Sequence, residues 1–260
     1  MARGAILSNS KAECLNKTNR MATIESEALR QAVESLYTVF GGYPLTTVEG
    51  GPCCVREEHK AVLFAKDLRR LTKDDLGRYS GKAMTTWGNA NDFKHFLPRI
   101  YELTAEFEAP CEEFVVFNKL EYGKWRTWPA VETEALERYL IVLWQVVLAR
   151  EEGYSSDYLI PLVNIYPRFD ELLQLWEEAE GDNAFVLLGE EVYWNSATVF
   201  SHKHLDNPIR SKRFHEWLKS SKVRDRLFAA FWNSQDEAVA EKLGVAYDLI
   251  ANDIKASRLR

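Results

Sequence analysis

The sequence predicts an all-α protein, built as a compact multi-helix bundle of helical-repeat-like hairpins. Apolar side chains recur at the i, i+3, i+4, i+7 spacing of amphipathic helices in several stretches of the chain. Residues typical of helix starts precede several of these stretches. No stretch alternates polar and apolar residues over six positions between turn dipeptides, so no β-hairpin is predicted. With 260 residues, 46% hydrophobic and 28% charged, the composition excludes disordered, collagen-like and coiled-coil proteins.

The first predicted helix covers 29–40, where apolar residues follow the helical spacing, and Gly41-Gly42 ends it. A second helix begins after Thr72, because a threonine followed three positions later by an acidic residue, here Asp75, forms a capping pair. The residues that follow place one apolar stripe on this helix: Leu76, Tyr79, Ala83, Met84 and Trp87.

Four further helix starts follow along the chain. Asn91 is expected to cap a helix through 93–103, in which Pro98 should produce a kink or a restart because it lacks an amide donor. Pro129 occupies the position of an N1 proline before a long helix through 136–147. The remaining start signals are Asn207-Pro208 and the pair Ser234 with Glu237, the latter opening a C-terminal helix through Val239, Leu243, Tyr247 and Ile250.

Two short stretches occur twice in the sequence. Residues 76–79 (LGRY) are echoed at 136–139 (LERY), and residues 97–103 (LPRIYEL) at 166–172 (YPRFDEL). One interpretation is two stacked helical hairpins, with Pro98 and Pro167 at equivalent kinks. The alternative is that proline, arginine and an acidic residue form a common helix start. Residues 21–260 are expected to form a single domain, with sub-units 21–125 and 126–260 as the alternative division.

The ends and the cysteines point to a cytoplasmic protein. Residues 1–20 are expected to be a disordered leader, since they lack the apolar core of a signal peptide. The longest apolar run, 139–149, has 11 residues with Gln145 inside it, whereas a bilayer span needs about 20. Four cysteines in a chain of this length form no disulfide framework. No membrane partner and no cofactor are therefore expected.

Residues 68–99 (LRRLTKDDL continuing through KAMTTWG to DFKHFLPR) and the upstream Gly51-Pro52-Cys53-Cys54-Val55 resemble a family of uncharacterised bacterial helical proteins. The resemblance covers about residues 43–103, well under half of the chain. It implies a bacterial, cytoplasmic, helical protein. The family has no assigned activity, so the resemblance transfers no catalytic residue.

Two groups of side chains could hold a metal. Cys53 and Cys54 lie close to His59, and His202 and His204 alternate in a segment expected to be a loop. Adjacent cysteines cannot easily direct both thiols at one ion, and no second Cys-x-x-Cys completes a ligand set. The alternative is a buried cysteine beside an idle one, together with a solvated histidine loop.

A third polar group comprises Trp87, Asp92, His95 and Arg99. His95 and Arg99 are four positions apart, and Asp92 lies three positions before His95, so the three share one helix face. Such a face could orient an acid or a phosphate. The alternative is structural, with Asp92 capping the helix and Arg99 pairing with a neighbouring helix.

Charge is distributed unevenly along the sequence. Residues 100–200 hold 6 basic and 20 acidic side chains, a net charge of −14, whereas the segments on either side are each +4. A field of this size repels nucleic acid and attracts a basic partner. The acidic residues expected to form a partner face are Glu132, Glu134, Glu137, Glu177, Glu178, Glu180, Glu190 and Glu191. The alternative is ordinary solvated helix faces, with carboxylates placed at helix N-termini.

Three functions follow from these observations. The leading hypothesis is a non-catalytic interaction protein of the immunity or antitoxin type, which covers a basic toxin domain with an acidic helical face. The second is a metal-binding protein or enzyme that uses the cysteine and histidine groups, although the common catalytic motifs are absent. The third, nucleic-acid binding by the basic C-terminal segment, ranks below both because acidic residues interrupt the basic ones.

Overall fold

The computed structural model describes residues 26–44, 48–51, 55–150 and 156–259, and within them the all-α prediction is confirmed. These residues contain two isolated β-bridges and no strand. The leader 1–20, Cys53 and Cys54 lie outside the described residues. The α-helices are α2 (Glu27–Phe40), α3 (Glu57–Phe64), α4 (Lys73–Lys82), α5 (Ala90–Ala105), α6 (Glu113–Tyr122), α7 (Ala130–Ala149), α8 (Ser156–Ile165), α9 (Phe169–Glu178), α10 (Asn183–Phe200), α11 (Pro208–Leu218), α12 (Ser221–Asn233) and α13 (Glu237–Arg258).

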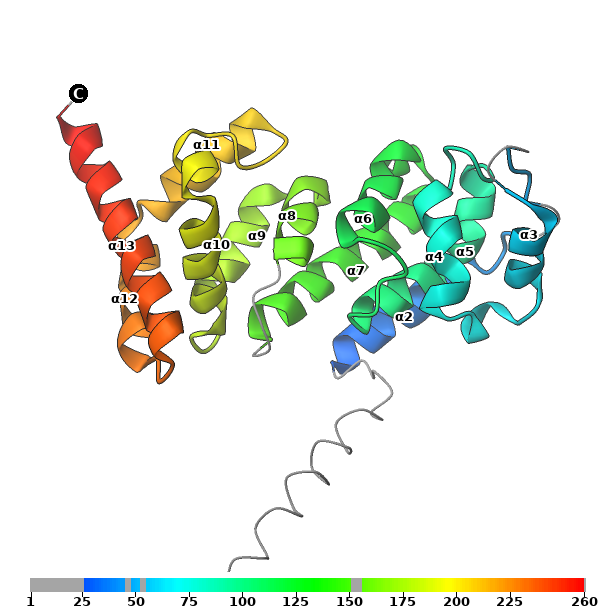
Figure 1. Cartoon of the computed structure of the whole chain (residues 1–260), viewed down its shortest axis with the longest axis horizontal. Coiled ribbons are helices and arrows are strands. Elements are labelled where there is room, and N and C mark those ends of the chain that lie inside the picture. The colour runs from blue at the N-terminus through cyan, green and yellow to red at the C-terminus, as the bar shows by residue number, and fades with distance from the viewer. Residues whose placement is uncertain (1–25, 45–47, 52–54, 151–155, 260) are drawn as a thin grey trace, which may run out of the picture.

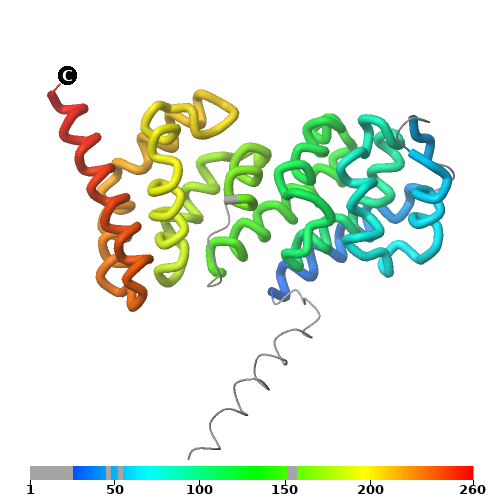
Figure 2. The backbone as a smooth tube through the Cα atoms, viewed as in Figure 1, coloured from blue at the N-terminus to red at the C-terminus, as the bar shows by residue number. Residues whose placement is uncertain are grey.

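The helices follow one another in a row across the molecule. Helices α3, α4 and α5 lie at one end, and α12 and α13 lie at the other (Figure 1). The backbone trace runs almost in chain order, from blue to red, along this row (Figure 2). Helix α2 is the main exception, because it packs against both α5 and α7. No helix among the described residues is both long and apolar enough to cross a bilayer.

Several helix boundaries agree with the predicted signals. The Thr72 hydroxyl accepts from the amide of Asp75, whose carboxylate accepts from the Thr72 amide in return, so the capping pair at α4 is confirmed. Asn207 caps α11, and Pro208 is its first residue. Helix α2 ends at Phe40, directly before the two glycines. Local hydrogen bonding therefore fixes these ends as the sequence predicts.

Five details of the helix prediction were wrong. Helix α4 ends at Lys82, so Ala83, Met84 and Trp87 of the predicted stripe lie beyond it. Helix α7 begins at Ala130, with Pro129 as its N-cap rather than its first residue. The cap of α5 is Asn89, not Asn91, because Asn89 accepts from two amides while Asp92 accepts from the Asn89 amide. The cap of α13 is Asp236 rather than Ser234. Helix α5 continues through Pro98, which is buried in its middle, so the predicted restart does not occur.

The internal echo does not correspond to equivalent positions. Pro98 lies inside α5, whereas Pro167 lies between the end of α8 and the start of α9. Tyr79 and Tyr139 are both fully buried, but only the Tyr139 hydroxyl has a partner, the carbonyl oxygen of Tyr101 at 2.7 Å. The helical-repeat character is therefore not confirmed. The alternative of a common helix start fits only residues 166–172, which span the start of α9, because the other echoed stretches lie inside α4, α5 and α7.

One apolar core runs through the described residues from Leu29 in α2 to Ile250 in α13. Large aromatic side chains fill it, including Trp87, Trp125, Trp144 and Trp176. Contacts between α2 and α7 and between α6 and α8 cross the alternative boundary at 125/126.

Candidate functional site

A cleft of about 460 Å³ opens between α6, α8 and α10 and the segment that joins α10 to α11. We call it the polar cleft. Its apolar lining consists of Phe114, Ile160 and Pro161. Its polar lining consists of three asparagines, three carboxylates, Thr198, Lys203 and His204. A cleft of this size is in the range of ligand pockets, which is about 300–1,000 Å³.

Glu191 and His204 form the buried part of the polar cleft. The Glu191 side chain is 1% exposed and the His204 side chain 5% exposed. Their closest atoms, Glu191 Oε1 and His204 Nε2, are 3.0 Å apart, and the contact lacks the direction of a hydrogen bond. Asn195 donates from Nδ2 to Glu191 Oε1 at 2.7 Å. The His204 ring also stacks on Phe214, which fixes its plane.

Helix α10 is kinked at the cleft. Asn195 leaves helical geometry with φ −115° and ψ 19°, and no proline lies in α10. The Thr198 hydroxyl donates to the Asn195 carbonyl oxygen at 2.9 Å. Side chains that enter the hydrogen-bond ladder are a recognised cause of helix kinks. The kink therefore lies where Glu191, Asn195 and Thr198 all face the polar cleft.

Three asparagines from three helices line the polar cleft: Asn118 of α6, Asn164 of α8 and Asn195 of α10. Asn118 is exposed, and its side chain makes no hydrogen bond with the described residues. The Asn164 side chain accepts from the Asp206 amide at 3.2 Å through Oδ1. An asparagine amide carries a donor and an acceptor side by side. The cleft is thus lined by groups that can both give and take hydrogen bonds.

Two exposed carboxylates, Asp157 and Asp206, lie at the edge of the polar cleft. Neither makes an ion pair with the described residues. Together with Glu191 they face a single lysine of the lining, Lys203. Because exposed carboxylates without partners attract cations, the polar cleft is suited to a basic group.

A histidine pair holds the segment between α10 and α11. His202 Nε2 lies 2.8 Å from His215 Nδ1, within hydrogen-bond distance. On the other side of the ring, His215 Nε2 lies 2.9 Å from Asp253 Oδ2 of α13. Burial lowers the pKa of His215, and the nearby Lys219 ammonium lowers it further. Burial favours neutral Asp253, but the contacts from Lys219 and His215 outweigh it and lower the Asp253 pKa. His202 itself has a left-handed backbone, with φ 60°.

The structure does not bring the eight predicted partner-face glutamates to one surface. Glu132, Glu190 and Glu191 are buried, so they are not accessible to a partner in this structure. Glu132 pairs with Lys94 at 2.6 Å, and Glu190 with Lys242 at 2.5 Å. Burying a carboxylate is tolerated here because each one has a charged or hydrogen-bonding partner.

The other five predicted glutamates lie nearer the surface. Glu137 pairs with Arg168, and Glu177 pairs with Lys222 and accepts from the Trp217 indole. Three remain exposed without an ion pair: Glu134, Glu178 and Glu180. Much of the acidic charge of residues 100–200 is therefore neutralised inside the chain.

The polar group of α5 is used in packing. Asp92 is buried and caps its own helix, and Trp87 is buried against Tyr79. His95 Nδ1 lies 2.7 Å from the Tyr43 carbonyl oxygen. Arg99 donates to the Leu71 carbonyl oxygen at 2.7 Å.

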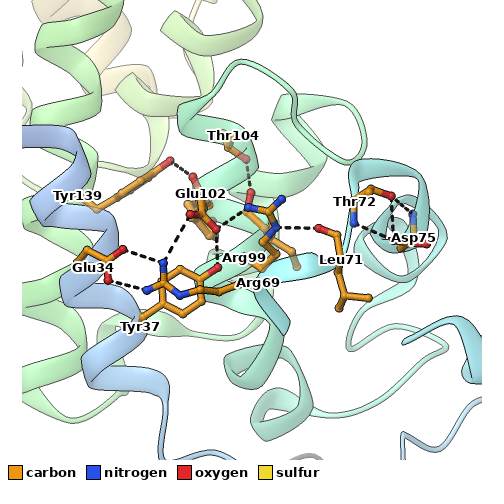
Figure 3. A network of polar contacts seen from close by, with 12 residues as sticks. Glu34, Tyr37, Arg69, Leu71, Thr72, Asp75, Arg99, Glu102, Thr104 and Tyr139 are labelled. Carbon is orange, nitrogen blue, oxygen red and sulfur yellow. Dashed lines mark hydrogen bonds and ion pairs between the residues drawn. The ribbon is translucent and has the colours of Figure 1, made fainter. Parts of the chain in front are cut away.

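Arg99 also belongs to a larger polar network. It donates to Glu102 at 2.6 Å, and the Tyr37 hydroxyl donates to the same carboxylate (Figure 3). Arg69 extends this network to Glu34 of α2. Burial and the hydrogen bond to Glu102 raise the pKa of Tyr37. These contacts join α2, α5 and the 3₁₀ segment Leu68–Arg70, so they correspond to the structural alternative.

Among the described residues, the three histidines predicted as metal ligands are not brought together. His59 accepts from the amide of Arg56 at the start of α3, while Cys53 and Cys54 are outside the described residues. His202 contacts His215, whereas His204 contacts Glu191. No group of three or more histidine, cysteine or acidic side chains within the described part of the chain could hold a metal ion.

Basic residues of the C-terminal segment bind main-chain carbonyls of other helices. Arg210 donates to the carbonyl oxygens of Val163 and Asn164 at 2.7 and 3.0 Å, at the end of α8. Arg226 donates to those of Ala179 and Gly181 at 2.8 and 2.7 Å, just after α9. These arginines satisfy carbonyls that helix ends leave without partners.

No family model matches the chain, and no curated protein and no solved structure matches it either. The function is therefore inferred from the residues of this chain alone.

The polar cleft itself was not predicted. Glu191 and His204 were singled out, but for two different functions, and the three asparagines and the two exposed aspartates were missed. Asn118, Asn164 and Asn195 are far apart in the sequence and no spacing links them. Only the packing of α6 against α8, with α10 beyond, places them around one cleft.

Proposed function

We propose that this protein is a non-catalytic interaction module that binds a basic segment of a partner protein in the polar cleft. The observation that carries the proposal is the pair of exposed carboxylates, Asp157 and Asp206, beside the buried carboxylate of Glu191. Lys203 is the one lysine or arginine in the lining of the cleft. A lysine or arginine side chain that entered the cleft would offset the negative charge of these carboxylates.

The wider charge of the chain supports the same partner. With its internal ion pairs included, the whole chain still carries a net charge of −6, which attracts basic proteins and repels phosphate-rich nucleic acid. The basic residues Arg210 and Arg226 are occupied by carbonyls, which disfavours a nucleic-acid surface there. A toxin domain blocked by this protein would fit the proposal if it presents a basic segment to the polar cleft.

The test uses a fluorescein-labelled peptide that alternates arginine and glycine, and measures its binding by fluorescence anisotropy. The double variant Asp157→Asn/Asp206→Asn should weaken binding by about tenfold, which corresponds to about 1.4 kcal/mol. Neutral asparagine preserves side-chain size, and exposed charges contribute little to folding, so stability should hardly change. The loss should shrink as salt rises from about 0.05 to 0.5 M, because salt screens exposed charges.

The matched control is Glu134→Gln/Glu178→Gln, which removes two exposed carboxylates that do not line the polar cleft. It removes the same amount of charge, so a general field effect would weaken binding equally in both variants. We expect the control to bind within about twofold of the unmodified protein. Equal losses in the two variants, or no binding by the unmodified protein, would overturn the proposal.

A further inference from the structure

We infer that the segment bound in the polar cleft is an extended strand whose main chain is recognised by asparagine side chains, chiefly Asn118 and Asn164. The inference rests on the proposed function and adds the conformation and the chemical pattern of the partner. It predicts a basic segment that is extended rather than helical when bound.

The chemistry of asparagine supports main-chain recognition. Its amide offers an N–H donor beside a C=O acceptor, which matches the C=O and N–H of a residue in an extended chain. In a helix the same main-chain groups are already bonded to each other, four residues apart. A helical segment would therefore leave these asparagines without main-chain partners, whereas an extended segment presents free groups along its length.

The asparagines are placed for this role. They come from three helices that line one cleft, so an extended segment lying across α6, α8 and α10 would meet all three. Asn118 is exposed with no hydrogen bond to the described residues. Asn164 uses Oδ1 for the Asp206 amide, which fixes its orientation and leaves Nδ2 to donate to a carbonyl. Asn195 is fixed in turn by Glu191, at the kink of α10.

The remaining lining gives the side-chain pattern. Phe114, Ile160 and Pro161 offer apolar surface, and Phe114 is 52% exposed without a partner covering it. Asp157 and Asp206 offer negative charge on the same cleft. Successive side chains of an extended segment point in opposite directions. The chemistry therefore fits a segment in which arginine or lysine alternates with apolar residues.

The experiment compares two peptides of one sequence that alternates arginine and isoleucine, with the main-chain nitrogens at its centre either free or methylated. Methylation removes main-chain donors and leaves the charge unchanged. Asn118→Ala/Asn164→Ala should weaken binding of the free peptide by about tenfold, because the variant removes the side-chain amides that would bond to its main chain. Methylation leaves the main-chain carbonyls in place, so the methylated peptide should bind the unmodified protein several-fold more weakly. The double variant should weaken the methylated peptide by a smaller factor than it weakens the free peptide, because only the contacts to carbonyls remain to be lost.

Two controls keep the result interpretable. Asn91→Ala/Asn252→Ala removes two exposed asparagines outside the polar cleft and should bind like the unmodified protein. The single variant Asn118→Ala removes no internal hydrogen bond, so its expected loss of about three- to tenfold cannot be attributed to misfolding. The salt dependence should be the same for the asparagine variants and the unmodified protein, because no charge changes.

The outcomes separate the two proposals. If binding requires Asp157 and Asp206 but is insensitive to methylation and to both asparagine variants, main-chain recognition is overturned while the proposed function stands. A helix-stabilised peptide of the same composition that binds as tightly would also overturn the extended conformation. If neither peptide binds, both proposals fail.

Discussion

Two buried glutamates, Glu132 and Glu190, pair with lysines of helices that are distant in the sequence. Lys94 of α5 and Glu132 of α7 are both less than 8% exposed, and the Tyr43 hydroxyl also donates to the Glu132 carboxylate. The Lys94 ammonium lies over the Trp128 ring as well, 4.3 Å from its centre. Removing one partner of such a pair typically costs about 3–5 kcal/mol, because the other charge stays buried. The buried glutamates thus contribute to the packing of one helix against another and not to the charge of the surface.

His215 should make the stability of the protein depend on pH. Burial and Lys219 lower its pKa below the ordinary value of 6.5, so the unfolded chain binds a proton that the folded chain does not. The contribution of His215 to the free energy of unfolding is therefore fully present above about pH 6.5. It is lost as the pH falls towards the lower pKa of the folded state. Urea unfolding between about pH 7.5 and 5 should show this loss, with a shallower pH dependence in His215→Gln.

The control for this experiment is His202→Gln. It removes the hydrogen-bonding neighbour of His215 but leaves the burial that chiefly lowers its pKa. We expect His202→Gln to keep most of the pH dependence of the unmodified protein. If the free energy of unfolding changes with pH as steeply in His215→Gln as in the unmodified protein, the prediction is wrong.

At the scale of helices, Gly189 allows α10 and α13 to approach each other closely. A Cβ atom at this position would lie 2.5 Å from Cδ2 and 3.3 Å from Cγ of Leu243, which is fully buried. Gly189→Ala should destabilise the protein by about 1–3 kcal/mol, the typical cost of overpacking a core. Equilibrium urea unfolding measures the change.

The matched control is Gly81→Ala in the last turn of α4. A Cβ atom there would meet nothing within 4 Å, so alanine should stabilise the protein by about 0.4–1 kcal/mol through the unfolded chain. Combining Gly189→Ala with Leu243→Val shortens the clashing side chain, so the pair should cost less than the sum of the two single changes. Stabilisation by Gly189→Ala would show that the helices can separate at no cost.

Side-chain caps allowed the starts of α4 and α11 to be predicted, whereas α6 and α10, which begin without such a cap, were not predicted. Thr72 and Asn207 determine the starts of α4 and α11 through their own side chains, so the sequence around them is sufficient. Helices α6 and α10 begin after Glu112 and Asp182, neither of which makes a side-chain cap. Such helices are stabilised by packing, which the sequence nearby does not reveal.

The polar cleft illustrates the same limit. Its residues come from α6, α8, α10 and the segment that follows α10. Within α8 (157, 160, 161, 164) and α10 (191, 195, 198) they follow helical spacing, but no spacing in the sequence links one helix to another. The uneven charge of the chain could be read from the sequence. Which carboxylates stay unpaired depends on helix packing, as the contrast between buried Glu190 and exposed Asp157 shows.

At the scale of the whole molecule, the continuous core predicts one cooperative unfolding transition. Helix α2 buries its apolar side chains partly against α7, across the alternative boundary at 125/126. The fragment 21–125 would expose that surface and should not unfold cooperatively when expressed alone. Far-ultraviolet circular dichroism and tryptophan fluorescence should give coincident urea transitions for the full chain.

The eight tryptophans make this comparison sensitive, because they are spread from Trp87 to Trp232 and report on both halves. The fragment 126–260 is the complementary control and should also fail to show a full cooperative transition. Two separated transitions in the full chain, or a cooperative fragment, would show instead that the halves are independent sub-units.

The arginines that bind helix-end carbonyls affect which positions of the sequence can tolerate substitution. Arg226 contacts the main chain of Ala179, and every amino acid supplies the same carbonyl oxygen at that position. A saturating mutational scan should therefore find position 226 intolerant and position 179 permissive, although the two are in direct contact. Paired positions of this kind show no covariation. Methods that infer contacts from covarying residues would miss the bonds that join α9 to α12.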